Sequence, residues 1–211
     1  MDIQVWSDVV CPWCYVGKRR LESAIASFDG DVTVTFRAFQ LDSSHPSPGL
    51  PLKQAMAAKF GDSAERMFDQ VTSIATGEGL RLDFDRAVAA NTFDSHRLIA
   101  WAAGQGRQAP MLAALQRAHF TDGLDIGSRA VLASVAGSIG LDRAAASAYL
   151  ESEAGTSAVN TDLAEARELG IASVPFFVVD GKYAVQGAQE ASTLVAALQE
   201  IARREAVDAG R

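Results

Sequence analysis

The chain has 211 residues, 48% of them hydrophobic, and its 19 Lys and Arg stand against 26 Asp and Glu, a net charge of −7. A chain of this length buries about 70% of its unfolded surface, so its two cysteines are not needed as scaffolding. The acidic balance excludes sequence-independent binding to nucleic acid or to an anionic membrane surface, because both need clustered Lys and Arg.

The N-terminal segment contains no basic stretch, apolar run and small-residue cleavage site in succession. No part of the chain approaches the roughly 18 consecutive apolar residues of a membrane span. We therefore expect no secretory signal and no membrane association, and we predict a cytoplasmic protein in a compartment where thiols are mostly reduced.

The opening of the chain predicts a β-α-β unit. Residues 3–7 form a short, apolar-rich alternating run typical of a strand, and residues 12–28 carry apolar side chains at helical spacing behind Pro12. Gly30 is expected to end this helix. Residues 32–39 are β-branched and alternating, which predicts a second strand.

Residues 45–155 begin with a loop rich in Pro and Gly and then have helical spacing with almost no strand signal. We expect a helical block here whose Leu, Ile and aromatic residues are mostly core. Its helices are marked by Met67, Val71 and Ile74, by Leu98, Trp101 and Ala102, by Leu112, Leu115, Gln116 and His119, and by the candidate N-caps Thr92, Ser128 and Asp142.

Strand signals return near the C-terminus. A helix with the apolar stripe Val159, Leu163, Ala166 and Leu169 is expected to stop at Gly170. Residues 176–179 and 183–186 predict a hairpin around the turn Asp180-Gly181, and residues 191–204 predict a final amphipathic helix. The predicted order is β-α-β, helical block, α-β-β-α.

Cys11 and Cys14 are the only cysteines, and Cys11-Pro-Trp-Cys14 lies between a predicted strand and a predicted helix. A structural disulfide over so short a loop would contribute only about 2 kcal/mol. A zinc site would need further ligands, and His45, His96 and His119 are dispersed without paired spacing. We therefore expect no metal.

A redox dithiol suits this position best. The free N–H groups and the positive dipole end at the start of a helix favour a thiolate on Cys11. Cys14, one turn further on, is expected to face inward beside Cys11, where it can attack a mixed disulfide and release the substrate. The pattern predicts Cys11 as the nucleophile and Cys14 as the resolving thiol.

The chain resembles the DsbA-like thioredoxin superfamily, and most closely its FrnE-like branch. The resemblance covers nearly the whole chain. It rests on Asp8-Val-Val-Cys-Pro-Trp-Cys-Tyr-Val-Gly17, Asn91-Thr-Phe-Asp-Ser-His-Arg97, Phe120-Thr-Asp-Gly-Leu-Asp-Ile126, Gly170-Ile-Ala-Ser-Val-Pro-Phe-Phe177 and Gly187-Ala-Gln189. It implies an α/β thioredoxin fold, formed by residues 1–44 and 156–211, interrupted by an all-helical insertion domain at residues 45–155.

The resemblance also implies further site residues. Pro175 would follow a cis bond and lie against the dithiol, and Val174 would offer its backbone to an extended substrate segment. Pro12 and Trp13 would tune the redox poise of the thiolate. Two weaker candidates are Asp8, as a buried carboxylate that handles the proton of Cys14, and His96, whose structural alternative is a satisfied core histidine.

Three functions remain open from the sequence. The first is a thiol-disulfide oxidoreductase that works without a bound cofactor on disulfide- or thiol-bearing proteins or on glutathione. The second is a glutathione-dependent enzyme similar to kappa-class glutathione transferases or hydroxychromene-carboxylate isomerases, although these relatives typically carry Ser at the position of Cys11. The third is a non-catalytic, redox-sensing module that binds a partner protein. The direction of electron flow and the oligomeric state do not follow from the sequence.

Overall fold

The computed structural model describes residues 1–43, 47 and 49–209. In chain order its elements are β1 (Asp2–Ser7), α1 (Pro12–Ala26), β2 (Thr33–Ala38), α2 (Leu52–Phe60), α3 (Ser63–Gly77), α4 (Phe93–Ala103), α5 (Gln108–Phe120), α6 (Arg129–Ser138), α7 (Arg143–Glu151), α8 (Thr156–Glu168), β3 (Phe176–Val179), β4 (Tyr183–Gln186) and α9 (Ala191–Ala209). The order agrees with the predicted one.

The four strands form one sheet in the order β2-β1-β3-β4. β1 and β2 are parallel, with Val5 opposite Phe36, as the crossover through α1 requires. β3 runs antiparallel to β1, with Phe177 opposite Val5, and β4 completes the predicted hairpin. The sheet therefore places strands from the N-terminal and C-terminal parts of the chain side by side. As a result, the start of α1 lies beside the start of β3.

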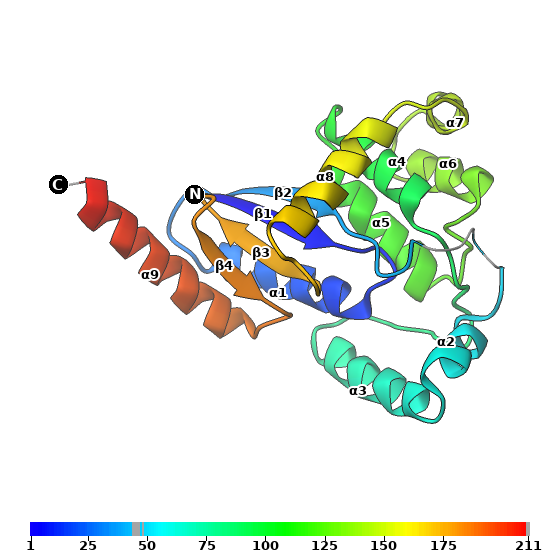
Figure 1. Ribbon diagram of the computed structural model, residues 1–211, viewed down its shortest axis with the longest axis horizontal. Coiled ribbons are helices and arrows are strands. Elements are labelled where there is room, and N and C mark those ends of the chain that lie inside the picture. Colours follow the sequence, from blue (N-terminus) through cyan, green and yellow to red (C-terminus); the bar gives the residue numbers. More distant parts are fainter. Residues whose placement is uncertain (44–46, 48, 210–211) are drawn as a thin grey trace.

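The alternation along β1 separates the two faces of the sheet. Ile3 and Val5 join a large core cluster that includes Leu21 of α1 and Leu194 and Leu198 of α9. Trp6 points to the opposite face, packs with Ala166 of α8, and donates a hydrogen bond from Nε1 to the carbonyl of Asp162 at 3.3 Å. Figure 1 shows α8 crossing one face of the sheet while α1 lies on the other.

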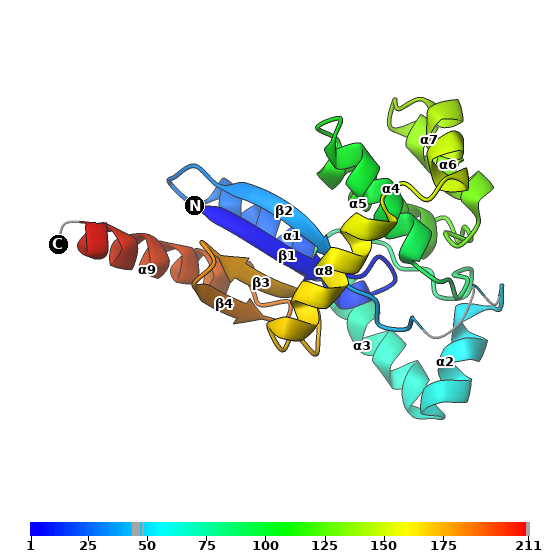
Figure 2. The same cartoon turned by 45° about the horizontal axis from the view of Figure 1, so that its top comes forward.

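Helices α2 to α7 gather beyond the end of the sheet at which β1 stops and α1 begins (Figure 2). A second cluster, built on Phe68, Phe84 and Phe120, packs there against Trp13 and Tyr15 of α1. The first turn of α1 is therefore enclosed by the helices. None of the helices in the described ranges is long and apolar enough to cross a membrane.

Several local predictions are wrong or untested. Helix α1 stops at Ala26, before Gly30, because the N–H groups of Ser27 and Phe28 donate to carbonyls three residues back instead of four, which closes the helix in a tighter turn. Leu169 (53% exposed) and Met67 (42% exposed) were assigned to apolar stripes but face solvent, since each lies at the edge of its stripe. Helix α2 was not predicted as a separate helix, and it buries none of its residues.

The predicted helix caps had mixed outcomes. Asp142 caps α7 as expected and accepts from the N–H groups of Ala144 and Ala145. Thr92 and Ser128 occupy N-cap positions, but their side chains make no capping hydrogen bond. The predicted domain boundary at residues 44 and 45 lies outside the described residues, as do His45, Pro46 and Pro48 of the loop, and the division into two domains stays a prediction.

Candidate active site

Cys11 is the N-cap of α1 and the first residue of the candidate site. Its backbone is extended, and its Sγ accepts a hydrogen bond from the backbone N–H of Cys14 at 3.3 Å. The sulfur lies 3.8 Å from the carbonyl oxygen of Val174, to which a thiol can donate. The side chain of Cys11 therefore meets the N-terminal end of the helix on one side and the backbone before β3 on the other.

Pro175 lies against the first turns of α1, and the Val174–Pro175 peptide bond is cis, in agreement with what the resemblance implies. A Cβ at Gly17 would approach Pro175 Cγ to 2.8 Å, so only glycine allows this helix to come so close. The carbonyl of Pro175 in turn accepts from the N–H of Gly187 at 2.8 Å. The predicted residues Cys11, Val174 and Pro175 are thus brought together.

Cys14 is reduced and buried, with 2% of its surface exposed against 4% for Cys11. Burial raises the pKa of the Cys14 thiol well above its ordinary value, and the neighbouring Cys11 and the charge of Asp8 raise it further. A backbone hydrogen bond from Asp8 opposes this shift in the pKa of Cys14. Cys14 therefore stays protonated until a base accepts its proton.

Asp8 is a carboxylate buried to 1% exposure at the end of β1. Its Oδ2 accepts the backbone N–H of Leu41 at 2.8 Å, and its Oδ1 lies 3.3 Å from Nε2 of His96. Its backbone carbonyl accepts the N–H of Cys11 at 3.2 Å. The carboxylate is therefore oriented by two donors, while the backbone of the same residue is hydrogen-bonded to the dithiol turn.

His96 reaches Asp8 from α4. Its Nε2 is 2.9 Å from the carbonyl oxygen of Phe39, and because a carbonyl only accepts, Nε2 carries the proton. The ring is 4% exposed. His96 does not contact either sulfur, so it is a buried partner of Asp8 rather than a group that touches the reacting atoms.

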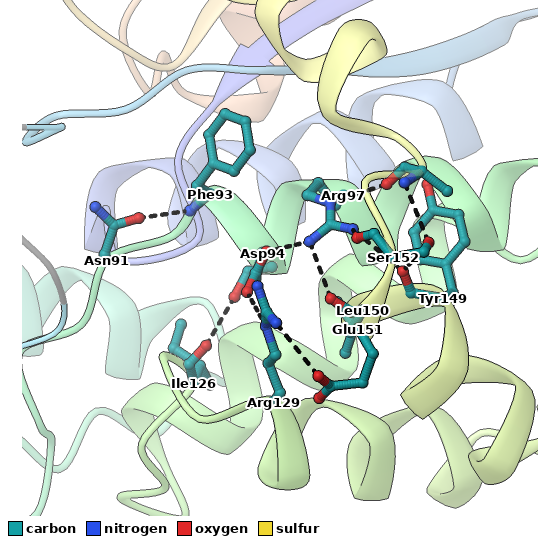
Figure 3. A network of polar contacts seen from close by, with 12 residues as sticks. Asn91, Phe93, Asp94, Arg97, Ile126, Arg129, Tyr149, Leu150, Glu151 and Ser152 are labelled. Carbon is teal, nitrogen blue, oxygen red and sulfur yellow. Dashed lines mark hydrogen bonds and ion pairs between the residues drawn. The ribbon is translucent and has the colours of Figure 1, made fainter.

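The rest of the Asn91–Arg97 motif fixes α4. Asn91 accepts the N–H of Phe93 at 2.9 Å (Figure 3). Ser95 donates to the carbonyl of Ile126 at 3.0 Å. Asp94 binds Arg97 Nη1 at 2.5 Å and Arg129 Nε at 2.7 Å. The motif is therefore a structural unit that holds His96 in place.

Arg97 ties α4 to the turn between α7 and α8. Its side chain is only 3% exposed. It donates to the carbonyls of Tyr149 at 3.1 Å, Leu150 at 3.3 Å and Ala154 at 2.9 Å, and also to that of Ser152 (Figure 3). A planar guanidinium suits this role because it offers five donors in a fixed geometry.

Pro12 and Trp13 complete the motif at the start of α1. Pro12 occupies the first helical position, where its missing N–H costs nothing. Trp13 is half-buried and packs against the Phe68 cluster of the helical block. The described residues contain no group of three His, Cys, Asp or Glu side chains arranged to hold a metal ion.

Three further residues belong to this region but were not assigned a role from the sequence. The importance of Gly17 could have been predicted, because glycine inside a helix costs about 1 kcal/mol relative to alanine and such a position usually has a packing role. Gln116 and His119 of α5 are fully buried, yet helical spacing alone placed them only among core residues. Their complete burial depends on how α5 packs against its neighbours, which no local pattern reveals.

Comparisons with known proteins place the chain in a family. The model of the DSBA-like thioredoxin domain matches residues 2–199. A probable DsbA oxidoreductase, SCO1869 from Streptomyces coelicolor, superimposes with a TM-score of 0.89 at 36% identity, over 95% of this chain and 89% of that one.

Two more distant structures share the fold. A 2-hydroxychromene-2-carboxylate isomerase has a TM-score of 0.72 at 17% identity over 98% of both chains. The cytosolic disulfide reductase DsbM from Pseudomonas aeruginosa, solved with GSH, has a TM-score of 0.68 at 21% identity over 96% of this chain and 100% of that one. The predicted α/β thioredoxin fold is confirmed, and the chain belongs to the family of DSBA-like thioredoxin domains.

Proposed function

We propose that this protein is a thiol-disulfide oxidoreductase that acts through Cys11 and Cys14. The observation that carries the proposal is the asymmetry of the two cysteines. Cys11 caps α1 and lies against the Val174 carbonyl, while burial and the charge of Asp8 hold the Cys14 thiol in its protonated form. One sulfur is arranged to react first and the other to react second.

In the first step, the Cys11 thiolate attacks one sulfur of a substrate disulfide. The substrate S–S bond breaks, and its other sulfur leaves as a thiolate that takes a proton from solvent. The helix N-terminus stabilises the negative charge on Cys11 before the attack. Val174, whose backbone lies beside the sulfur, supports docking of an extended segment that carries the disulfide.

In the second step, Cys14 gives its proton to the Asp8 carboxylate and attacks Cys11 Sγ. The bond between Cys11 and the substrate sulfur breaks, and the substrate leaves as a second thiolate. The substrate has then gained two electrons and the protein has become the Cys11–Cys14 disulfide. The reverse sequence oxidises a dithiol, so the same residues serve either direction. His96 positions Asp8 for this transfer.

We further propose proteins or glutathione as the thiol-bearing partners, the cytoplasm as the location, and no bound cofactor. The support for the first two is the fold shared with a protein named a cytosolic disulfide reductase and solved with GSH. Membership of the FrnE-like branch likewise stays a prediction.

The test is a redox titration. The purified protein is equilibrated with defined ratios of reduced and oxidised glutathione, and free Cys11 and Cys14 are counted by alkylation and mass spectrometry. We expect a reversible transition of two thiols, with a potential that decides between disulfide donor and reductase.

Two results would contradict the proposal. Tight binding of glutathione without thiol exchange would favour a glutathione-dependent transferase or isomerase. A pair that reacts once with an oxidant, does not turn over on unrelated disulfides and changes the affinity for a single partner would favour a redox sensor.

A further inference from the structure

One buried arginine of α1 contacts two segments that lie far apart in the chain. Arg20 is 7% exposed. Its Nε donates to Glu78 Oε1 at 2.6 Å, and Glu78 is the C-cap of α3. Its Nη1 donates to the carbonyl of Ala188 at 2.8 Å, and its Nη2 lies 2.6 Å from Oε1 of Glu190. Each of the three nitrogens therefore has its own partner.

The segment that Arg20 holds has no regular secondary structure. Residues 187–190 connect β4 to α9 and belong to neither a helix nor a strand, so individual contacts must fix their backbone. Contacts from α1 do so. Arg20 binds the carbonyl of Ala188, and a Cβ at Gly17 would lie 3.5 Å from both Cα and Cβ of Ala188. Gly17 and Arg20 are three positions apart on α1, so both face this segment.

The same segment supports Pro175 directly. The N–H of Gly187 donates to the carbonyl of Pro175 at 2.8 Å. Val174, the residue before Pro175, places its own carbonyl oxygen 3.8 Å from Cys11 Sγ. A path of direct contacts therefore leads from the guanidinium of Arg20, through the backbone of residues 187 and 188, to the backbone beside the attacking sulfur.

The other partner of Arg20 belongs to the helical block. Glu78 ends α3, and α3 contributes Phe68 to the cluster that packs against Trp13 and Tyr15 of α1. A cation near the last turn of a helix also interacts favourably with the negative end of the helix dipole. Arg20 therefore fixes α3 against the helix that carries the dithiol.

A guanidinium suits this junction because its donors point in fixed directions within one plane. A lysine would offer a single nitrogen in place of three separated ones. The side chain of Glu78 is 22% exposed, whereas that of Glu190 is 66% exposed, so water screens the pair with Glu190 and this pair contributes little. The contacts of Arg20 with Glu78 and with the Ala188 carbonyl should therefore matter most.

We propose that Arg20 is a positioning residue for thiol exchange: it holds residues 187–190 and the end of α3 against α1, and so fixes the backbone of Val174 and Pro175 on which an extended substrate docks. The inference rests on the proposed dithiol function. Arg20 acts through the backbone and not at the sulfurs. Its loss should therefore weaken the docking of a peptide segment, and it should leave the attack of Cys11 on a small disulfide unchanged.

The first measurement examines the guanidinium in the wild-type protein by nitrogen NMR. Because Nη1 and Nη2 of Arg20 bind different partners, rotation about its Cζ–Nε bond should be slow, and the two nitrogens should give separate signals. Arg19, whose side chain is 52% exposed, should give one averaged signal. An averaged signal from Arg20 would overturn the proposal. This measurement depends neither on a variant that folds nor on thiol exchange.

The second measurement separates a positioning role from a structural one. Arg20→Met keeps an apolar side chain in place and removes all three contacts, and Arg19→Met is the matched control one position earlier on the same helix. The rate at which each reduced protein is oxidised is measured against the concentration of two disulfides, one within an extended peptide and the other 2-hydroxyethyl disulfide, which has no peptide segment. For Arg20→Met we expect the peptide concentration that gives half the maximal rate to rise about tenfold, and the rate with the small disulfide to stay within about twofold of wild type.

Arg19→Met should match the wild-type protein with both disulfides. Equal losses with the two disulfides in Arg20→Met would mean that the variant only lowers the amount of folded protein. No loss with the peptide would mean that the docking backbone is held without Arg20. Either result overturns the proposal and leaves the dithiol function intact. If the wild-type protein reacts with neither disulfide, it is the proposed function that fails, so the two failures are distinguishable.

Discussion

The sheet half and the helical block contribute different things to the candidate site. Cys11 and Cys14 lie at the start of α1 and Pro175 directly before β3, all at one end of the sheet, and hydrogen bonds with backbone groups hold the sulfur of Cys11. His96 comes from α4, one of the helices inserted between β2 and β3, and its buried side chain contacts the Asp8 carboxylate. The sheet half positions the two sulfurs of the proposed dithiol, whereas the helical block supplies a buried partner to the carboxylate beside them.

Substitution of the cysteines should have the largest effect on thiol exchange. If it had none, the sheet half would not carry the reacting atoms. We expect Cys11→Ser to abolish thiol exchange, because it removes the attacking sulfur. We expect Cys14→Ser to accumulate a mixed disulfide on Cys11, because release needs the second thiol. Mass spectrometry after incubation with oxidised glutathione distinguishes the two. Undiminished turnover in either variant would remove the dithiol mechanism.

Arg97 tests whether the helical block is needed to support the site. Arg97→Met keeps the packing but removes the Arg97 donor from Asp94 Oδ1 and leaves several buried carbonyls without a donor, so we expect a loss of about 3–5 kcal/mol in the free energy of unfolding. Urea denaturation measures the loss. Arg129→Met, whose side chain is 45% exposed, is the control and should cost less than about 1 kcal/mol. Equal losses would show that burial of Arg97 is not what matters.

His119 makes the stability of the helical block dependent on pH. Its pKa is about 4 in the folded chain because of burial, against an ordinary value of 6.5. Between these values the unfolded chain binds a proton that the folded chain does not. The folded chain therefore has its full stability, as far as His119 is concerned, above pH 6.5. As the pH falls toward 4, the free energy of unfolding decreases by about 3 kcal/mol in total.

His119→Phe should flatten the dependence of unfolding free energy on pH between 4 and 6.5, measured by urea denaturation at a series of pH values. Gln116→Leu is the matched control, since it changes the same buried region without removing a titratable group, and it should keep the wild-type slope. A wild-type slope in His119→Phe would mean that another group causes the acid sensitivity.

Gly17 tests whether the close approach of α1 to Pro175, in the sheet half, matters for thiol exchange. Gly17→Ala places a methyl group against Pro175 Cγ, and overpacking of this kind costs about 1–3 kcal/mol, partly offset by a gain in helix propensity of about 1 kcal/mol. We expect slower exchange as Pro175 moves. Gly77→Ala, with open space around its position, should be neutral or slightly stabilising. Unchanged exchange in Gly17→Ala would show that the position of Pro175 is not critical.

Much of the fold and of the reacting core could be predicted from the chain. Short-range patterns predicted β1, α1 and the β3–β4 hairpin, because alternation, helical spacing and the Asp180-Gly181 turn are local properties. The position of Cys11 at the start of a helix follows from the same patterns. The end of α1 and the exposure of Leu169 were predicted wrongly, since both depend on neighbours that a single periodic stripe does not encode.

The sequence by itself determined that Cys11 and Cys14 are neighbours, because two cysteines at a strand–helix junction need only local geometry to come together. Only the tertiary structure decided what surrounds them. Asp8 and His96 are 88 residues apart, and their contact exists because the fold brings the first turns of α4 to the residue that follows β1. The burial of His119 on α5 is likewise a product of packing between distant segments, and that burial is what lowers its pKa.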